Sequence, residues 1–151
     1  MKRLEEAIDE GFFLEASWIA YAVIEDRIGS ALLKTGGLPQ DQNGKPLQML
    51  GSKLKVLETR MNEDPILQSC FEKDEILKRV VYWKNRRNPL MHSMASEAKP
   101  WSVLEQEAAI VAKEGKDVAW LLANSVSRLR KRKKRQSNAQ LSHISLDPEL
   151  T

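Results

Sequence analysis

The sequence predicts an all-α protein built as an antiparallel bundle of four to five helices. Apolar residues recur at spacings of three and four along most of the chain, which is the spacing of one helix face. Glycine and proline cluster between these segments, and no stretch alternates apolar and polar residues as a half-buried strand would. The 151 residues suffice for one domain with a substantial core. We assign residues 1–135 to this helical domain and predict that the polar tail, residues 136–151, is poorly ordered.

The clearest helix covers residues 12–34, where a wide apolar face runs the length of the segment. Lys34 in the last turn and Gly36 just beyond it are favourable residues for a helix end. The preceding residues 3–10 either extend this helix or form a short helix of their own before Gly11.

The middle of the chain contains a loop and two further helices. Residues 36–46 are rich in glycine, proline and polar residues, which predicts a loop. Leucine residues at spacings of three or four predict a helix over residues 47–62, which the sequence "NEDP" ends. Residues 65–72 are expected to form a short helix that begins with Pro65.

Two long helices complete the predicted bundle. Asp74 is a suitable N-cap for a helix that continues into "NRRNPLMHSM", residues 85–94. After it, "SVLE" fits a capping box in which Ser102 is the cap. The last helix is expected to bend near Gly115 and to end at about residue 134.

The tryptophans and the single cysteine are predicted to belong to the core. Cys70 lies among apolar residues and is expected to pack as a small hydrophobe. A stacking role stays open only for the tryptophan beside Pro100, in a loop. The four tryptophans fall mostly on apolar helical faces: Trp18, Trp83, Trp101 and Trp120.

Composition excludes several classes of protein. No apolar run approaches transmembrane length, the N-terminus lacks the apolar segment of a secretory signal, and one cysteine cannot form an intrachain disulfide. These features favour a cytoplasmic protein that does not span a membrane. Two histidines and one cysteine, far apart in sequence, give no metal-ligand pattern, and no phosphate-binding loop is present. We therefore expect neither a metal nor a cofactor.

The positive charge of the chain is concentrated near its C-terminus. The net charge is +3, and "RLRKRKKR", residues 128–135, holds seven basic residues, so the remaining residues together carry −4. This run is either a solvated helix end that complements the helix dipole or a patch that binds the phosphates of nucleic acid. An anionic membrane surface is a weaker interpretation, because no aromatic residue interrupts the run. For nucleic acid, we select Arg130, Lys131 and Lys133 as candidate substrate contacts.

Residues 85–94 are the best candidate for a functional site. Asn is a favoured N-cap and Pro is favoured at the first helical position, so Asn88-Pro89 predicts the end of one helix and the start of another. His92 would then lie in the first turn, where the helix dipole disfavours an imidazolium. Arg87 would lie at the same helix end, where anions bind well. The structural alternative pairs Arg87 with an acid from another helix and half-buries His92.

The segment "RNPLMH", from Arg87 to His92, resembles the R-N-x-x-x-H motif of the HEPN superfamily, the higher eukaryote and prokaryote nucleotide-binding domains. The resemblance covers six residues as a motif and about residues 10–130 as an architecture. It implies a HEPN-like helical bundle that dimerises with the motifs facing each other. Many members are metal-independent endoribonucleases, often toxins or antiviral effectors.

The resemblance also implies roles for individual residues. Arg87 would stabilise charge on the scissile phosphate, and His92 would transfer protons. Asn88 would orient or polarise the reacting groups of the site. Arg86 fits the looser motif spacing and is kept as a substrate contact. In HEPN toxins paired with nucleotidyltransferase antitoxins, a tyrosine stands two residues after the histidine. Here that residue is Met94, so regulation by modification of such a tyrosine is not expected.

These arguments predict a metal-independent endoribonuclease that cleaves RNA at a site shared across a homodimer. An antitoxin or a defence-system protein would be its partner. The alternative is a non-catalytic helical module that binds a nucleotide or a protein and uses Arg87 structurally. A third hypothesis is a small DNA-binding protein that acts through residues 128–135, although no recognition helix is evident.

Overall fold

The computed structural model describes residues 1–96 and 99–144, with residues 141–144 described as backbone only. Within these ranges the chain forms helices and no strand, so the prediction of an all-α bundle is confirmed. The helices are α1 (Lys2–Asp9), α2 (Phe13–Lys34), α3 (Leu50–Glu63), α4 (Pro65–Phe71), α5 (Ile76–Ala95) and α6 (Trp101–Ile144). None of these helices is long and apolar enough to cross a membrane.

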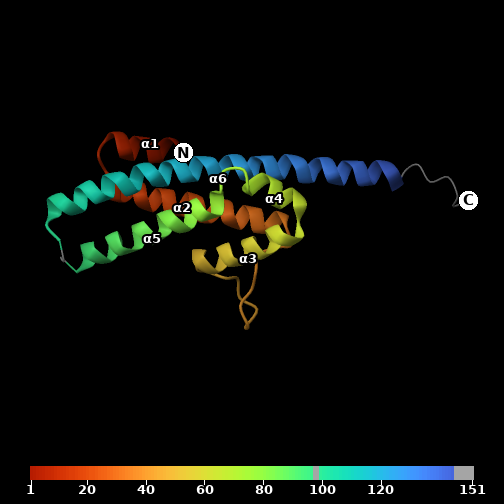
Figure 1. Cartoon of the computed structure of the whole chain (residues 1–151), viewed down its shortest axis with the longest axis horizontal. Helices are drawn as coiled ribbons and strands as arrows, with labels where there is room; N and C mark the ends of the chain where they lie inside the picture. The colour runs from red at the N-terminus through yellow and green to blue at the C-terminus, as the bar shows by residue number, and fades with distance from the viewer. Residues whose placement is uncertain (97–98, 145–151) are drawn as a thin grey trace, which may run out of the picture.

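The long helix α6 is the centre of the bundle. Figure 1 shows α2 running alongside it, with α1 at one edge of the pair and α3 and α5 at the other. The most extensive packing joins α2 to α6, and α5 and α4 also pack on α6. The largest buried side chains of this core include Ile24, Ile28 and Leu32 of α2, and Leu122 and Leu129 of α6. Burial of such side chains, at about 25 cal/mol per Å² of apolar surface, is the main source of the bundle's stability.

Trp83 fixes the position of α5 on α6. Its ring is almost fully buried, and its indole N–H donates a 2.8 Å hydrogen bond to the backbone oxygen of Val111. A Cβ atom added to Gly115 would lie 2.8 Å from the ring, closer than real Cβ contacts. Helix α6 is continuous through Gly115. The glycine therefore has a packing role, because only a residue without a side chain lets the ring approach this closely.

Other tryptophans are not core residues, which corrects the sequence-based prediction. Trp18 and Trp101 are each 62% exposed and Trp120 is 44% exposed. An apolar residue at helical spacing lies in the core only if another element covers it, and the sequence pattern alone does not show that. Cys70 is fully buried, as predicted.

Two of the predicted N-caps were wrong. Helix α5 begins after Glu75, which has a positive φ of 47° and makes no capping hydrogen bond through its side chain. Asp74 instead lies 3.6 Å from the guanidinium of Arg128. Helix α6 begins at Trp101, so Ser102 lies inside its first turn.

The ends of the other helices follow the sequence pattern more closely. Residues 2–9 form a separate helix before Gly11, and α4 begins with Pro65, as expected. The predicted end of α6 near residue 134 was wrong, because the helix continues to Ile144. Residues 145–151 of the expected tail lie outside the described residues.

Candidate functional site

The predicted helix start at Asn88-Pro89 is not present. Helix α5 is continuous from Ile76 to Ala95, and Pro89 lies inside it. Proline has no N–H to donate to the carbonyl oxygen four residues earlier, at Asn85, and such a position costs about 3 kcal/mol. Trp83 and Leu90 are buried on either side of this point. Their burial holds the helix together across the proline, so tertiary packing overrides the local preference.

His92 consequently lies in the last turn of α5 and not in a first turn. The nearby helix end is the negative end of the dipole, so the sequence-based argument for a neutral imidazole no longer applies. The side chain is exposed, which also contradicts the half-buried alternative. Within residues 1–96 and 99–144, no side chain forms a hydrogen bond or an ion pair with it. His92 is therefore accessible to a molecule that approaches the outer face of α5.

Arg87 packs against two aromatic rings of α2. Its guanidinium carbon lies 4.5 Å from the centre of the Tyr21 ring and 5.8 Å from that of Trp18. Burial lowers the pKa of Arg87 below its usual value, and Tyr21 opposes this shift. One guanidinium nitrogen, Nη1, donates a long 3.4 Å hydrogen bond to Oδ1 of Asn88, whereas the buried Nε has no hydrogen-bond partner. No carboxylate of the described residues pairs with this arginine.

Arg86 is the arginine that has an acidic partner. It forms an ion pair with Glu114 of α6, and its guanidinium lies 5.7 Å from the centre of the Tyr82 ring. The structural alternative paired Arg87 with an acid of another helix. The arginine that has such a partner is Arg86, and the acid is Glu114. The two adjacent arginines diverge, one toward α6 and the other toward α2. Arg87 is thus the better candidate for an anion ligand, because the charge of Arg86 is already balanced.

Asn88 lies beside Arg87 in sequence and one turn before His92. It is on the same side of α5 as His92, and it accepts the hydrogen bond from Arg87. Arg87 and His92 themselves point about 140° apart around the axis of a regular helix. The three polar residues therefore lie along one part of α5, but the histidine and arginine side chains do not converge on a single point within one chain.

The basic run on α6 is divided between structural and exposed residues. Lys133 forms a 2.6 Å ion pair with Asp64. Although burial raises the pKa of Asp64, Lys133 and the backbone N–H groups of α4 lower it below its ordinary value of 3.8. Arg128 and Arg132 also donate hydrogen bonds to the α4 region. These cations therefore fix α4 to α6.

Arg130 and Lys131 are exposed, and no acid in the described part of the chain pairs with them. Arg130 follows Glu114, the partner of Arg86, by sixteen residues, or about 24 Å along the helix. The structure therefore does not bring the predicted contacts Arg130, Lys131 and Lys133 to the Arg87–His92 edge within one chain.

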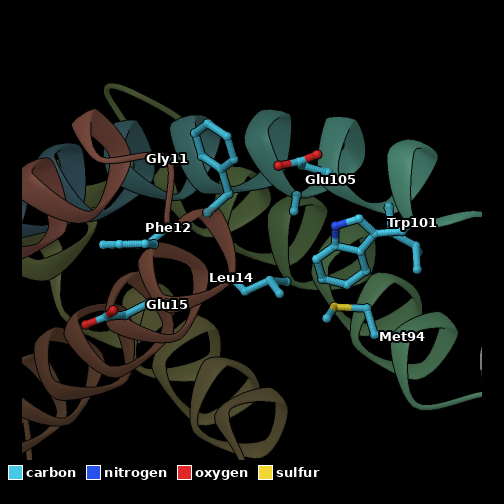
Figure 2. A pocket seen from close by; sticks show the side chains of 10 residues that line it. Gly11, Phe12, Leu14, Glu15, Met94, Trp101 and Glu105 are labelled. Atoms are coloured by element: carbon cyan, nitrogen blue, oxygen red, sulfur yellow. The ribbon is translucent and has the colours of Figure 1, made fainter.

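An apolar cavity of about 270 Å³ lies between the α1–α2 turn, the end of α5 and the start of α6. Figure 2 shows Trp101 close to Met94, with Leu14 and Phe12 nearer the α2 side. Trp101, which the sequence left open, thus lines a hollow whose walls are mainly apolar. The cavity suits an apolar group, and it offers no cation to a phosphate.

The aromatic residues next to the arginines escaped the sequence analysis. Trp18 was assigned to the core, and neither Tyr21 nor Tyr82 was selected. The three-residue spacing of Trp18 and Tyr21 places both on one side of α2, which the sequence does show. The arrangement of α2 and α5 brings this side of α2 to Arg87. No local sequence pattern predicts that arrangement.

No group of three or more metal-binding side chains occurs among the residues that the structure describes. Comparisons with models of protein families, with curated proteins and with solved structures found no significant match for this chain.

Proposed function

We propose that this chain is a metal-independent endoribonuclease of the HEPN type, with a site shared across a homodimer. One observation carries the proposal: the guanidinium of Arg87 is held by aromatic rings, lacks an acidic partner among the described residues, and donates to Asn88, which lies one turn before the exposed His92. The "RNPLMH" motif is the sequence feature that the proposal explains.

The state of Arg87 favours an anionic ligand. A partly buried cation without a counter-charge is unfavourable, and a buried N–H without an acceptor is unfavourable as well. A phosphodiester supplies both a negative charge and acceptor oxygens, and Arg binds phosphate through two parallel hydrogen bonds. The rings of Trp18 and Tyr21 stabilise the guanidinium plane from α2. Binding of the phosphate thus supplies the counter-charge that Arg87 lacks among the described residues.

The proposed reaction is an in-line attack by the 2′-hydroxyl of RNA on the adjacent phosphate. A base takes the proton of the 2′-hydroxyl, the 2′-oxygen bonds to phosphorus, and the bond from phosphorus to the 5′-oxygen breaks. An acid gives a proton to the leaving 5′-oxygen. The products are a 2′,3′-cyclic phosphate and a 5′-hydroxyl. Arg87 would stabilise the charge that develops on the phosphate oxygens.

A homodimer can bring together groups that one chain keeps apart. The reaction needs an Arg87 and a His92 at the same phosphate, and each chain offers one of each at this edge. Arg87 and His92 also diverge within one helix. A two-fold axis near α5 would bring the His92 of each chain toward the Arg87 of the other. Trp18, 62% exposed beside Arg87, adds apolar surface that a second copy can cover.

The proposal is tested by incubating the purified protein with mixed RNA in the presence of EDTA. We expect the wild type to cut RNA, the His92→Ala variant to be inactive, and a matched DNA strand to stay intact, because it lacks the 2′-hydroxyl. The control variant is His143→Ala, which removes the only other histidine. Equal activity of the wild type and His92→Ala would refute the proposal. Tight RNA binding without cleavage would favour the non-catalytic module instead.

A further inference from the structure

A broad groove lies between α3 and α5. It encloses about 830 Å³, and the residues that matter for its chemistry are Lys55 of α3 and Val81, Tyr82, Lys84 and Asn85 of α5. The proposed reaction at Arg87 and His92 uses none of these residues.

The groove carries unbalanced positive charge. Neither Lys55 nor Lys84 pairs with a carboxylate of the described residues. The Lys84 ammonium reaches the start of α3, since a Cβ added to Gly51 would lie 4.0 Å from it. Lys78 also lines the groove, but Glu75 balances its charge through a 2.6 Å ion pair. One carboxylate, that of Glu58, lies among the groove residues, so the two unpaired lysines leave the groove cationic.

Tyr82 offers an aromatic surface in the same groove. Its side chain is 62% exposed. The Arg86 guanidinium lies 5.7 Å from the ring centre, and its ion pair with Glu114 fixes its position. Arg86 therefore packs against one face of the Tyr82 ring. An exposed aromatic ring in a cationic groove is the combination by which proteins bind single-stranded nucleic acid, because any base can stack on the ring.

The groove is aligned with His92. Val81, Asn85 and His92 are spaced four and seven residues apart, which places them in one line along the outer face of α5. Tyr82 precedes His92 by ten residues, which is about 15 Å along the helix axis and about 80° around it. Stacked nucleotides rise by about 3.4 Å, so about four or five of them would cover this distance.

We propose that the α3–α5 groove binds the single strand of the RNA substrate and leads it to His92. A base stacks on Tyr82, and Lys55 and Lys84 bind phosphates. This inference rests on the proposed function, and it adds a substrate class, single-stranded RNA of at least about five nucleotides, together with the residues that select it.

The test measures binding of a fluorescein-labelled single strand of 2′-O-methyl oligouridine, about ten nucleotides long, to the whole protein. The methyl group blocks the attacking hydroxyl, so binding is separated from cleavage. We expect Tyr82→Ala to weaken binding about tenfold and Tyr82→Phe to bind like the wild type, because the ring is kept. A double variant, Lys55→Gln with Lys84→Gln, loses two phosphate contacts. The negative slope of log affinity against log salt concentration should therefore become shallower by about 1.4.

Lys113→Gln is the matched control, because Lys113 is an exposed lysine of α6 outside the groove. It should bind like the wild type, and circular dichroism checks that every variant is folded. A duplex of equal length should bind more weakly than the single strand. If the duplex or an acidic peptide of equal charge binds equally well, or if Tyr82→Ala binds like the wild type, the inference is wrong.

The outcomes separate this inference from the proposed function. If RNA is cut in a His92-dependent manner while the groove variants keep full affinity, the groove inference alone fails. If the groove variants lose affinity for the 2′-O-methyl strand but the wild type never cuts RNA, the nuclease proposal fails and the groove remains a binding surface for single strands.

Discussion

The guanidinium of Arg87 lies 4.5 Å from the centre of the Tyr21 ring, although the two residues are far apart in sequence and belong to different helices. The neighbouring Arg86 has a carboxylate partner in Glu114, whereas Arg87 contacts aromatic rings and Asn88 and pairs with no carboxylate of the described residues. Two adjacent arginines thus have different environments, and the one without a counter-charge in the described part of the chain belongs to the "RNPLMH" motif.

Arg87 should be intolerant of a change to lysine. Lys keeps the charge, but it loses the planar group that stacks on Tyr21 and that binds phosphate through two hydrogen bonds. We expect both Arg87→Lys and Arg87→Ala to lower the rate of RNA cleavage by about 100-fold or more, as does loss of other groups that stabilise a transition-state charge. Single-turnover cleavage measures this rate. An Arg87→Lys variant with the wild-type rate would show that stacking and bidentate binding are not needed.

Tyr21 tests the support of that arginine. Tyr21→Phe keeps the ring beneath the guanidinium. Its cleavage rate should stay within a few-fold of the wild-type rate, because loss of one neutral hydrogen bond costs only about 1 kcal/mol. Tyr21→Ala removes the ring and should lower the cleavage rate while leaving the helical content, measured by circular dichroism, unchanged. Equal rates for the two variants would contradict a positioning role for the ring.

Gly115→Ala should destabilise the bundle. The added methyl group would lie 2.8 Å from the Trp83 ring, and overpacking of this kind costs about 1–3 kcal/mol. Gly29→Ala in α2 is the matched control, because no atom lies within 4 Å of the added Cβ and alanine is the better helix former. Urea unfolding measures both changes. A combined Trp83→Phe and Gly115→Ala variant should be more stable than the sum of the single changes predicts, since the smaller ring relieves the clash.

Asp64 should contribute stability that acid removes. Its carboxylate accepts hydrogen bonds from the N–H groups of Ile66 and Leu67 and pairs with Lys133. Because folding lowers the pKa of this carboxyl below the ordinary 3.8, the ionised group favours the folded state above that pH. The contribution is lost as the pH falls through the lower folded-state pKa.

Two variants separate the roles of Asp64. Asp64→Ala should cost about 1–2 kcal/mol at neutral pH, as loss of an N-cap does, and Asp64→Asn should cost less, because asparagine also caps helices. Urea unfolding at neutral pH and at pH values below 3.8 measures the difference. A deficit of Asp64→Ala that grows on acidification would show that the sign of the pKa shift is wrong.

The helices follow from the sequence because each must bury one apolar face, and that requirement repeats every three to four residues. The predicted helix boundary at Asn88-Pro89 was wrong because packing in the core outweighs the local preference of these residues. Local preferences at these two residues favour a break, but Trp83 and Leu90 are buried on either side of it and Trp83 donates a hydrogen bond to Val111 of α6. A local pattern does not include the free energy of contacts with another helix.

The candidate site was predictable only in part. The motif identifies Arg87, Asn88 and His92 by spacing, and two adjacent arginines are visible in the sequence. Which of them meets Glu114 and which meets Tyr21 depends on how α5 rotates against α2 and α6. The distance between the basic run and the motif likewise depends on where α5 packs along α6, which the ion pair of Arg86 with Glu114 shows.

We propose that two copies of this chain share one RNA-cleaving site, and a mixed dimer tests this sharing most directly. Arg87→Ala and His92→Ala chains, co-expressed with different affinity tags, are purified as the heterodimer and compared with each homodimer and with the wild type. The heterodimer keeps one Arg87 and one His92, on opposite chains. We predict that it cuts RNA faster than either inactive homodimer. A heterodimer as inactive as both homodimers, beside an active wild type, would contradict the shared site, as would a wild type that cuts RNA as a monomer.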